Sequence, residues 1–316
     1  MERRSDEQTS CVNEIATNAA QRRRTTASSS SDHFLPFVPY PNLGNTCFLN
    51  SSLQFFRAVW NRVGTAIPID SPCPIFPLLL HPVSDADLAS RIRQLPIWRK
   101  LVWGEQHDAH EAMHLMLETD HVMHQQCNPL TCFAHKMKEF CALSFYSNLK
   151  CTNIGCPWTK NTSPEFALDL SVAIKDSNSL PGLLKVFQKS ELLTSSGSYI
   201  CGQCGSVVRK EMHVKPTAKV FLAHFKRFDE RNRKCGKTIK FPRELRVGNV
   251  RFAFAAMVQH VGHAKKQGHY VTYVAEDMIN HDDSKVLCYD DSHVFETTWS
   301  HIASREAYML AYVRKA

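Results

Sequence analysis

The sequence predicts an α+β fold in which helices precede a strand-rich C-terminal part. Two segments have apolar residues at helical spacing, one beginning near Thr46 and the other opened by residues 106–111. From Val214 onward the chain is rich in strand-favouring residues with partial alternation. Helices and strands that are segregated along the chain in this way are typical of α+β proteins.

The composition is that of a globular chain. Hydrophobic residues make up 43% and charged residues 22% of the 316 residues, which is enough for one large domain or two small ones. No apolar run approaches the roughly 20 residues needed to cross a bilayer, and no signal-peptide core lies near the start. We therefore expect no membrane partner and an intracellular location, in the cytoplasm or the nucleus. There, the 12 cysteines would serve metal binding, catalysis or packing.

The first 33 residues are polar and lack hydrophobic periodicity. Such a segment buries too little apolar surface to offset its conformational entropy, so we predict a disordered tail over 1–33. Residues 34–316 are then predicted to form the folded domain.

Cys47 is the leading candidate for a reactive residue. The polar loop 42–46 contains Gly44 and runs into the helix expected from Thr46, so Cys47 falls in the first helical turn. Unpaired N–H groups and the positive end of the helix dipole stabilise a thiolate there, and a thiolate is the form that attacks carbonyl carbons.

Residues 42–54 resemble the cysteine box of the ubiquitin-specific proteases, the papain-like deubiquitinating enzymes. A second set of segments resembles the histidine box of that family in order and in residue type: Gly268-His269-Tyr270, residues 289–294 and residues 307–310. The resemblance extends over about residues 40–314. It implies a papain-like cysteine peptidase with a helical thumb (about 40–145), zinc-ribbon-like fingers (about 146–213) and a β-rich palm (about 214–316).

The resemblance also implies roles for individual residues. His269 would take the proton of Cys47 and later protonate the leaving amine. Asp290 would orient His269, and the adjacent Asp291 is the alternative for that role. Asn42, with the backbone N–H of Cys47, would stabilise the oxyanion of the tetrahedral intermediate. Catalysis of this kind requires no cofactor.

Asp108 and Glu111 are three residues apart at the start of the second predicted helix, so both carboxylates are expected on one face. Acidic residues in a first turn interact favourably with the helix dipole, which is a sufficient reason for them to be there. The resemblance implies a second role, because the family uses acidic residues here to hold the basic C-terminal tail of ubiquitin. Gly268 and Tyr270, which flank His269, are predicted to contact substrate as well.

Two cysteine pairs, Cys151/Cys156 and Cys201/Cys204, are separated by about 45 residues. Paired cysteines on two tight turns are how zinc-binding knuckles assemble a tetrahedral thiolate site. We predict one structural zinc ion here, within the fingers that the resemblance implies. A second group contains metal-binding residue types but matches no site of the family, so a second metal is left open: His121, His124, Cys127, Cys132 and His135.

The function implied by the resemblance is thiol-dependent hydrolysis of the isopeptide or peptide bond after the C-terminal glycine of ubiquitin. Two alternatives are a catalytically silent ubiquitin-binding module and a protease specific for a ubiquitin-like modifier. The partners would be ubiquitin or ubiquitinated proteins, and the oligomeric state is not predicted.

Positive charge is concentrated in residues 207–241, where eleven Lys and Arg residues stand against three acidic residues, an excess of eight that equals the net charge of the whole chain. One interpretation is a solvated surface. The other is a docking site for an acidic partner or nucleic acid, centred on Arg231, Arg233, Lys234 and Lys237, which we expect to be exposed.

Overall fold

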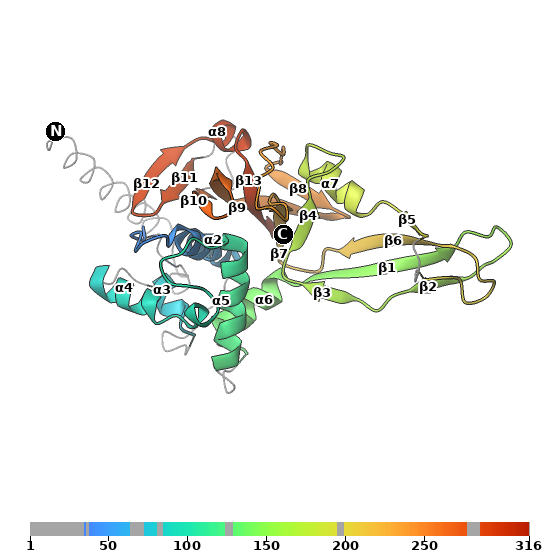
Figure 1. The fold of residues 1–316 in the computed structure, drawn as a ribbon, viewed down its shortest axis with the longest axis horizontal. Coiled ribbons are helices and arrows are strands. Elements are labelled where there is room, and N and C mark those ends of the chain that lie inside the picture. Colours follow the sequence, from blue (N-terminus) through green and yellow to red (C-terminus); the bar gives the residue numbers. More distant parts are fainter. Residues whose placement is uncertain are drawn as a thin grey trace.

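The computed structural model describes residues 35, 38–63, 73–80, 85–123, 129–194, 199–276 and 285–315. The predicted disordered tail, residues 1–33, lies outside these ranges and its prediction is not tested. The described chain forms a helical layer, a large sheet packed against it, and a long narrow sheet that projects from the body (Figure 1).

The helical layer comes from the first part of the chain, as predicted. It contains α2 (Cys47–Val63), α3 (Phe76–Leu80), α4 (Asp85–Arg93), the 3-10 helix η2 (Pro96–Arg99), α5 (Ala109–Met123) and α6 (Phe133–Cys141). α5 begins three residues later than the opening predicted at Gln106. Asp108 explains the difference, because its Oδ1 accepts hydrogen bonds from the backbone N–H groups of His110 and Glu111 and so caps the helix.

Within the described residues the large sheet has eight strands, in the order β12-β11-β10-β9-β13-β7-β4 with β8 paired to β9. The strands are β4 (Leu170–Ala173), β7 (Val220–Lys226), β8 (Glu244–Val247), β9 (Val250–Ala264), β10 (Gln267–Ala275), β11 (Val286–Asp290), β12 (His293–Thr297) and β13 (Ala307–Arg314). Their pairing is antiparallel except for β4 with β7. The strand-rich part expected from Val214 onward contains seven of these eight strands, from β7 to β13.

α2 packs on the large sheet and is buried almost along its whole length. The side chain of Thr272 on β10 donates a hydrogen bond to the carbonyl of Ser51 in α2, at 2.9 Å. Apolar residues of α2, such as Phe48 and Leu53, share one core with Val258 and Tyr308 of the sheet. This core fixes the start of α2 relative to β10 and β11.

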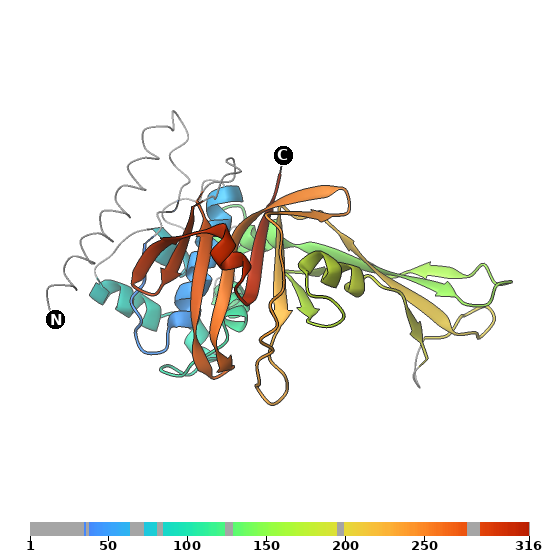
Figure 2. The same ribbon diagram turned by 90° about the horizontal axis from the view of Figure 1, so that it is seen from above.

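The long sheet consists, in the part of the chain that the structure describes, of β1 (Leu143–Cys151), β2 (Thr159–Asn161), β3 (Glu165–Ala167), β5 (Glu191–Leu193) and β6 (Val208–Lys215). It extends away from the body in both views (Figure 2). Near its far end the buried apolar cluster is small: Leu149, Cys201 and Val208.

Two short helices complete the described fold, α7 (Leu180–Phe187) and α8 (Trp299–Ala303). Ser179 and Thr298 cap them with their side-chain oxygens. Among the described residues, no helix combines the length and the apolar character needed to span a membrane.

Candidate active site

Cys47 is the first residue of α2, as the sequence predicted. The loop before it is held by Asn42, whose Oδ1 accepts hydrogen bonds from the backbone N–H groups of Gly44 and Thr46, both at 3.1 Å. Gly44 and Asn45 have positive φ angles of 92° and 56°, which a glycine and an asparagine tolerate best. The side chain of Cys47 is 3% exposed. The thiol is therefore a buried group in the first turn of α2.

His269 lies on β10, and its Nε2 is 2.6 Å from Oδ1 of Asp290 at the end of β11. His269 is also hydrogen-bonded to Cys47. Since Asp290 occupies Nε2, Nδ1 is the nitrogen that remains for the thiol. The hydrogen bond with Cys47 is the largest cause that raises the pKa of His269 to about 9; burial opposes it and Asp290 reinforces it. The structure thus brings Cys47, His269 and Asp290 together.

Asp291 occupies a different place from Asp290, although the two are adjacent. Its Oδ2 is 3.9 Å from Nε2 of His269, beyond hydrogen-bond distance. Its two carboxylate oxygens accept hydrogen bonds from Asn42 and Asn50, each at 2.8 Å. Asp290 is therefore the nearer candidate for orienting His269, and Asp291 connects β11 to the loop and helix that carry Cys47.

Asn42 donates one hydrogen bond from Nδ2 to Asp291. A side-chain amide carries two N–H groups, so this bond does not exhaust its donors. The predicted oxyanion role of Asn42 is compatible with this arrangement and stays a prediction.

Asp108 and Glu111 do not form a joint surface, contrary to the expectation from their spacing. Asp108 is 5% exposed and accepts a hydrogen bond of 2.6 Å from the hydroxyl of Tyr308. Burial alone would raise the pKa of Asp108, but the bond from Tyr308 and the charge of Lys265, 3.6 Å away, lower it. Asp108 thus caps α5 and joins it to the large sheet, whereas Glu111 is exposed. The substrate contacts predicted for Asp108 and Glu111 are not tested and stay predictions.

Gly268 and Tyr270 flank His269 in different environments. Tyr270 is fully buried. A Cβ atom at Gly268 would lie 2.4 Å from Nε2 of His260 and 2.5 Å from the carbonyl oxygen of Val261, so only glycine fits. The substrate role predicted for these two residues is not tested, and for Tyr270 the burial of its side chain leaves the backbone as the part that can reach a ligand.

Gln106 was missed from the sequence. Its Nε2 donates to the carbonyl of Gly268 at 2.7 Å, and its Oε1 accepts from the N–H of Gly268 at 3.1 Å. The side chain thereby bridges the helical layer to the strand of His269. Residues 106 and 268 are far apart in sequence, and a glutamine before a helix gives no signal of such a contact.

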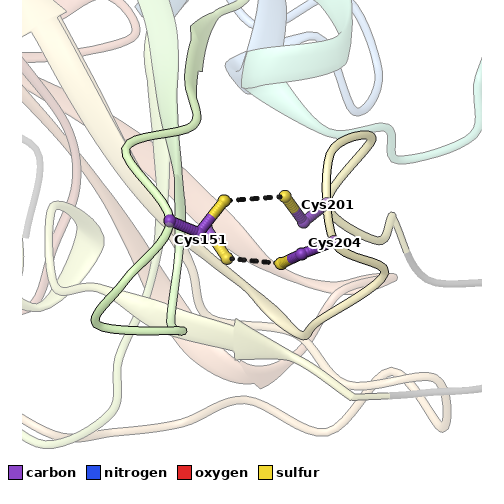
Figure 3. Close-up of side chains that lie close together, drawn as sticks. Cys151, Cys201 and Cys204 are labelled. Atoms are coloured by element: carbon purple, nitrogen blue, oxygen red, sulfur yellow. Dashed lines mark hydrogen bonds between the residues drawn. The ribbon is translucent and has the colours of Figure 1, made fainter.

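The four cysteines predicted to bind zinc lie together near the far end of the long sheet. The sulfurs of Cys151 and Cys204 are 3.5 Å apart, and those of Cys156 and Cys201 are 3.7 Å apart. Figure 3 shows Cys151 facing Cys201 and Cys204, with the sulfur atoms pointing toward one another. Disulfide sulfurs would be about 2 Å apart, whereas a tetrahedral zinc–thiolate site with bonds of about 2.3 Å has sulfurs about 3.8 Å apart.

The surroundings of these cysteines also suit a metal. Backbone N–H groups of Asn153 and Gln203 donate to the sulfurs of Cys151 and Cys201, both at 3.4 Å. Hydrogen bonds from Ser206, first from its side chain and then from its backbone, lower the pKa of Cys204 to about 6, whereas burial raises the pKa of Cys151 to about 12. The four sulfurs lie within 4.8 Å of one another and form the donor set of a structural zinc site, so the four cysteines could bind zinc.

The second group of metal-binding residue types lies only partly within the described residues. His124 and Cys127 lie outside the described residues, as does the side chain of His121. Cys132 is 2% exposed at the start of α6, and His135 is half-buried in that helix.

The basic segment 207–241 is less exposed than predicted. Lys234 was expected at the surface, but its side chain is 4% exposed and its Nζ pairs with Glu306 at 2.5 Å. Arg227 is also buried, with its guanidinium bound to the carbonyls of Ala307, Cys235 and Lys237. Both cations serve packing of the large sheet. An acidic or nucleic-acid partner for the remaining charges stays a prediction.

Comparisons with known proteins identify the family of the chain. The family model of the ubiquitin carboxyl-terminal hydrolases matches residues 87–312. The chain belongs to this family. Ubiquitin carboxyl-terminal hydrolase 25 of Arabidopsis thaliana is 24% identical over 86% of this chain and 46% of its own length. Probable ubiquitin carboxyl-terminal hydrolase 16 of Schizosaccharomyces pombe is 25% identical over 90% of this chain and 68% of its own length.

Solved structures show the same fold. A Ubp8-containing SAGA DUB module bound to monoubiquitin has a TM-score of 0.71 at 22% identity, over 96% of this chain and 75% of that one. The related module bound to ubiquitin aldehyde has a TM-score of 0.69. The expected mixed helix-and-sheet fold of the ubiquitin-specific proteases is therefore confirmed. The chain spans less than half the length of several curated relatives that it matches.

Proposed function

We propose that this chain is a cysteine peptidase that cleaves the isopeptide or peptide bond after the C-terminal glycine of ubiquitin. The arrangement that supports this best is Cys47 at the start of α2, hydrogen-bonded to His269, whose other nitrogen is 2.6 Å from Asp290. Ubiquitin is proposed as the substrate because the chain belongs to the ubiquitin carboxyl-terminal hydrolase family and shares its fold with a module bound to monoubiquitin.

The mechanism follows from the positions of these side chains. His269 takes the proton of Cys47, and its raised pKa makes the imidazole a stronger base for this step. The thiolate attacks the carbonyl carbon of the terminal glycine, and the imidazolium protonates the leaving amine as the C–N bond breaks. Asp290 keeps the ring oriented with one nitrogen toward the thiol.

The oxyanion of the tetrahedral intermediate would lie beside Cys47. The donors proposed for it are the backbone N–H of Cys47 and the side-chain amide of Asn42. Asp291 fixes Asn42 by the hydrogen bond of 2.8 Å, so the donor is positioned before substrate arrives. Water then attacks the thioester with His269 as general base, which releases ubiquitin and regenerates Cys47.

We assign the helical layer to the thumb, the large sheet to the palm and the long sheet to the fingers of the family. Zinc bound by Cys151, Cys156, Cys201 and Cys204 would be structural: it would cross-link the β1 end to the loop before β6, where the buried apolar cluster is small. Metal analysis of the purified chain should find this zinc, and Cys201→Ser should release it.

Two alternative functions would be compatible with the same fold. A silent ubiquitin-binding module would bind without turnover, and a protease for a ubiquitin-like modifier would prefer another C-terminal tail. The hydrogen-bonded Cys47 and His269 favour an active enzyme over a silent module.

The proposal is tested with a fluorogenic amide at the C-terminus of ubiquitin and of ubiquitin-like modifiers. Wild type should cleave the ubiquitin substrate most efficiently by kcat/KM. Cys47→Ala should lose turnover but bind ubiquitin with a Kd close to that of wild type, because the recognition surface is retained. Binding without turnover by wild type would support the silent module, and faster cleavage of another modifier would reassign the substrate.

A further inference from the structure

A second group of histidines and an aspartate lies where helix α5 meets strands β4 and β7. His110 and His114 are one helical turn apart on α5, Asp169 directly precedes β4, and His224 is on β7 opposite Ser171. These residues have no part in the mechanism proposed above. They come from three separate segments, so the group joins the helical layer to the large sheet.

Asp169 is the centre of the group. Its Oδ2 is 3.0 Å from Nε2 of His110 and 2.6 Å from Nε2 of His114. The Asp169 side chain is 5% exposed, whereas those of His110 and His114 are 20% and 34% exposed. One buried carboxylate oxygen and two imidazole nitrogens thus converge at a point that solvent can reach past His114.

His224 adds a third imidazole with an unused nitrogen. Ser171 donates a hydrogen bond to Oδ1 of Asp169 at 3.2 Å, and its oxygen lies 2.7 Å from Nδ1 of His224. Because the Ser171 hydroxyl has one hydrogen, Nδ1 of His224 carries the proton of that contact. Nε2 then has a lone pair, and it is buried with no hydrogen-bond partner among the described residues. A buried polar atom of this kind requires an explanation.

We propose that His110, His114 and Asp169, with His224 beside them, form a second metal site that binds a divalent transition ion of the zinc class. Imidazole nitrogens with one carboxylate oxygen are a usual ligand set for such ions. The candidate ligand atoms of His110, Asp169 and His224 lie within 4.8 Å of one another. Histidines four apart on a helix share one face, so His110 and His114 can bind a single ion.

The role of His224 follows from the orientation of its ring. The rings of His110 and His224 are stacked, with centroids 3.7 Å apart and an angle of 11° between their planes. Two parallel imidazoles cannot both direct their lone pairs at one ion. We assign His110, His114 and Asp169 as direct ligands because Nε2 of both histidines contacts Oδ2 of Asp169. His224 becomes the fourth ligand after its ring turns, which gives its unpartnered Nε2 a partner. The contact of Nδ1 with Ser171 is the second hydrogen bond that metal-binding histidines usually make.

The competing interpretation is a hydrogen-bond network without metal, in which the two histidines of α5 donate to Asp169. That network satisfies Asp169 but leaves Nε2 of His224 unexplained. The two interpretations differ in stoichiometry. The metal site adds one equivalent to whatever the four cysteines bind, whereas the network adds none.

The test is cobalt binding to the full chain, prepared metal-free under reducing conditions and titrated with Co²⁺. Cobalt bound to the cysteines gives a thiolate-to-metal charge-transfer band, whereas cobalt at the histidine group gives d–d bands without it. Wild type should bind two equivalents with both signatures. His114→Gln and Asp169→Asn should each lose the second equivalent while keeping the charge-transfer band.

His213→Gln is the matched control, because His213 is a half-buried histidine on β6 outside the group. It should retain both equivalents. Circular dichroism and the charge-transfer band report whether each variant is folded, and His114 is exposed enough to be replaced without loss of the core. A single equivalent in wild type overturns the proposal. So does a second equivalent that persists in both His114→Gln and Asp169→Asn, which would place the metal elsewhere.

Discussion

The chain contains two groups of histidine and aspartate side chains that have the same residue types but different surroundings. At the active site, His269 and Asp290 are 35% and 42% exposed in their side chains, and a thiol completes the group. At the junction of α5 with β4 and β7, the Asp169 side chain is only 5% exposed and the added groups are further imidazoles. The first group can transfer a proton to a substrate, whereas the second can only hold structure or an ion.

The pKa shifts of the two groups are opposite in direction. The hydrogen bond with Cys47 raises the pKa of His269 to about 9. Burial, followed by the charge of His110, lowers the pKa of His224 to about 3. A nearby aspartate alone therefore does not make a histidine reactive. Its third neighbour and its access to solvent decide whether the ring is a proton carrier or a neutral donor of a lone pair.

The largest effect should come from the thiol that distinguishes the two groups. Cys47→Ala should lower kcat by at least about 10³-fold, because the covalent route is lost. Cys235→Ala is the matched control: that cysteine is exposed, and its replacement should leave hydrolysis within about twofold. Steady-state hydrolysis of the ubiquitin amide measures both, and residual turnover of Cys47→Ala near wild type would remove its assignment.

The next effect should separate the two adjacent aspartates. Asp290→Ala should lower kcat by about 10²- to 10⁴-fold, since His269 loses the partner that orients its ring. Asp291→Ala should lower kcat less and should also lower the melting temperature, because Asp291 fixes Asn42 and Asn50. Comparing kcat and the melting temperature of the two variants decides which aspartate orients His269. If Asp291→Ala is the worse catalytic lesion, the two roles are exchanged.

For stability the order of the two groups should be reversed: replacing Asp169 should destabilise the fold more than replacing Asp290. With a chelator present, Asp169→Ala should lower the free energy of unfolding by about 2–4 kcal/mol, because a buried carboxylate with histidine partners is removed. Asp290→Ala should lower it by less than about 1 kcal/mol, since that side chain is 42% exposed. Urea unfolding measures both. Equal losses would show that the two groups do not differ in the way described.

The smallest effect is a shift of the pH profile. A histidine whose folded pKa is raised stabilises the fold below its unfolded pKa of about 6.5 and loses that contribution as pH rises toward the folded value of about 9. The imidazolium is also the acid that protonates the leaving amine. The alkaline limb of kcat/KM should therefore lie near pH 9 and move to lower pH in Asp290→Asn. A limb that does not move in this variant would show that Asp290 leaves the pKa of His269 unaffected.

The sequence was sufficient to predict that Cys47 lies at the start of a helix and that His269 lies near the start of a strand. Cys47 follows a glycine-containing loop into an apolar helix, and His269 precedes a strand in a motif that the family shares. Local signals of this kind depend on residues close in the chain. The four-cysteine cluster was also predictable, because paired cysteines have few other uses in such a chain.

The remaining features depend on packing that no local pattern encodes. His110, Asp169 and His224 come from three segments, and each one alone resembles an ordinary polar residue. Lys234 was expected in solvent because it lies in a basic segment, yet its side chain is buried and its ammonium pairs with Glu306, which directly precedes β13. Asp108 was predicted to share a helix face with Glu111, and only the position of Tyr308 shows that its carboxylate is turned into the core.

The central claim is that His269 makes Cys47 the reactive thiol of the chain. Ubiquitin with a thiol-trapping electrophile at its C-terminus tests it most directly, with the adduct located by peptide mass spectrometry. The account predicts one adduct, on Cys47, which is absent in Cys47→Ser and forms much more slowly in His269→Ala. Labelling of another cysteine, such as the exposed Cys204 or Cys235, or an unchanged rate in His269→Ala, would contradict it.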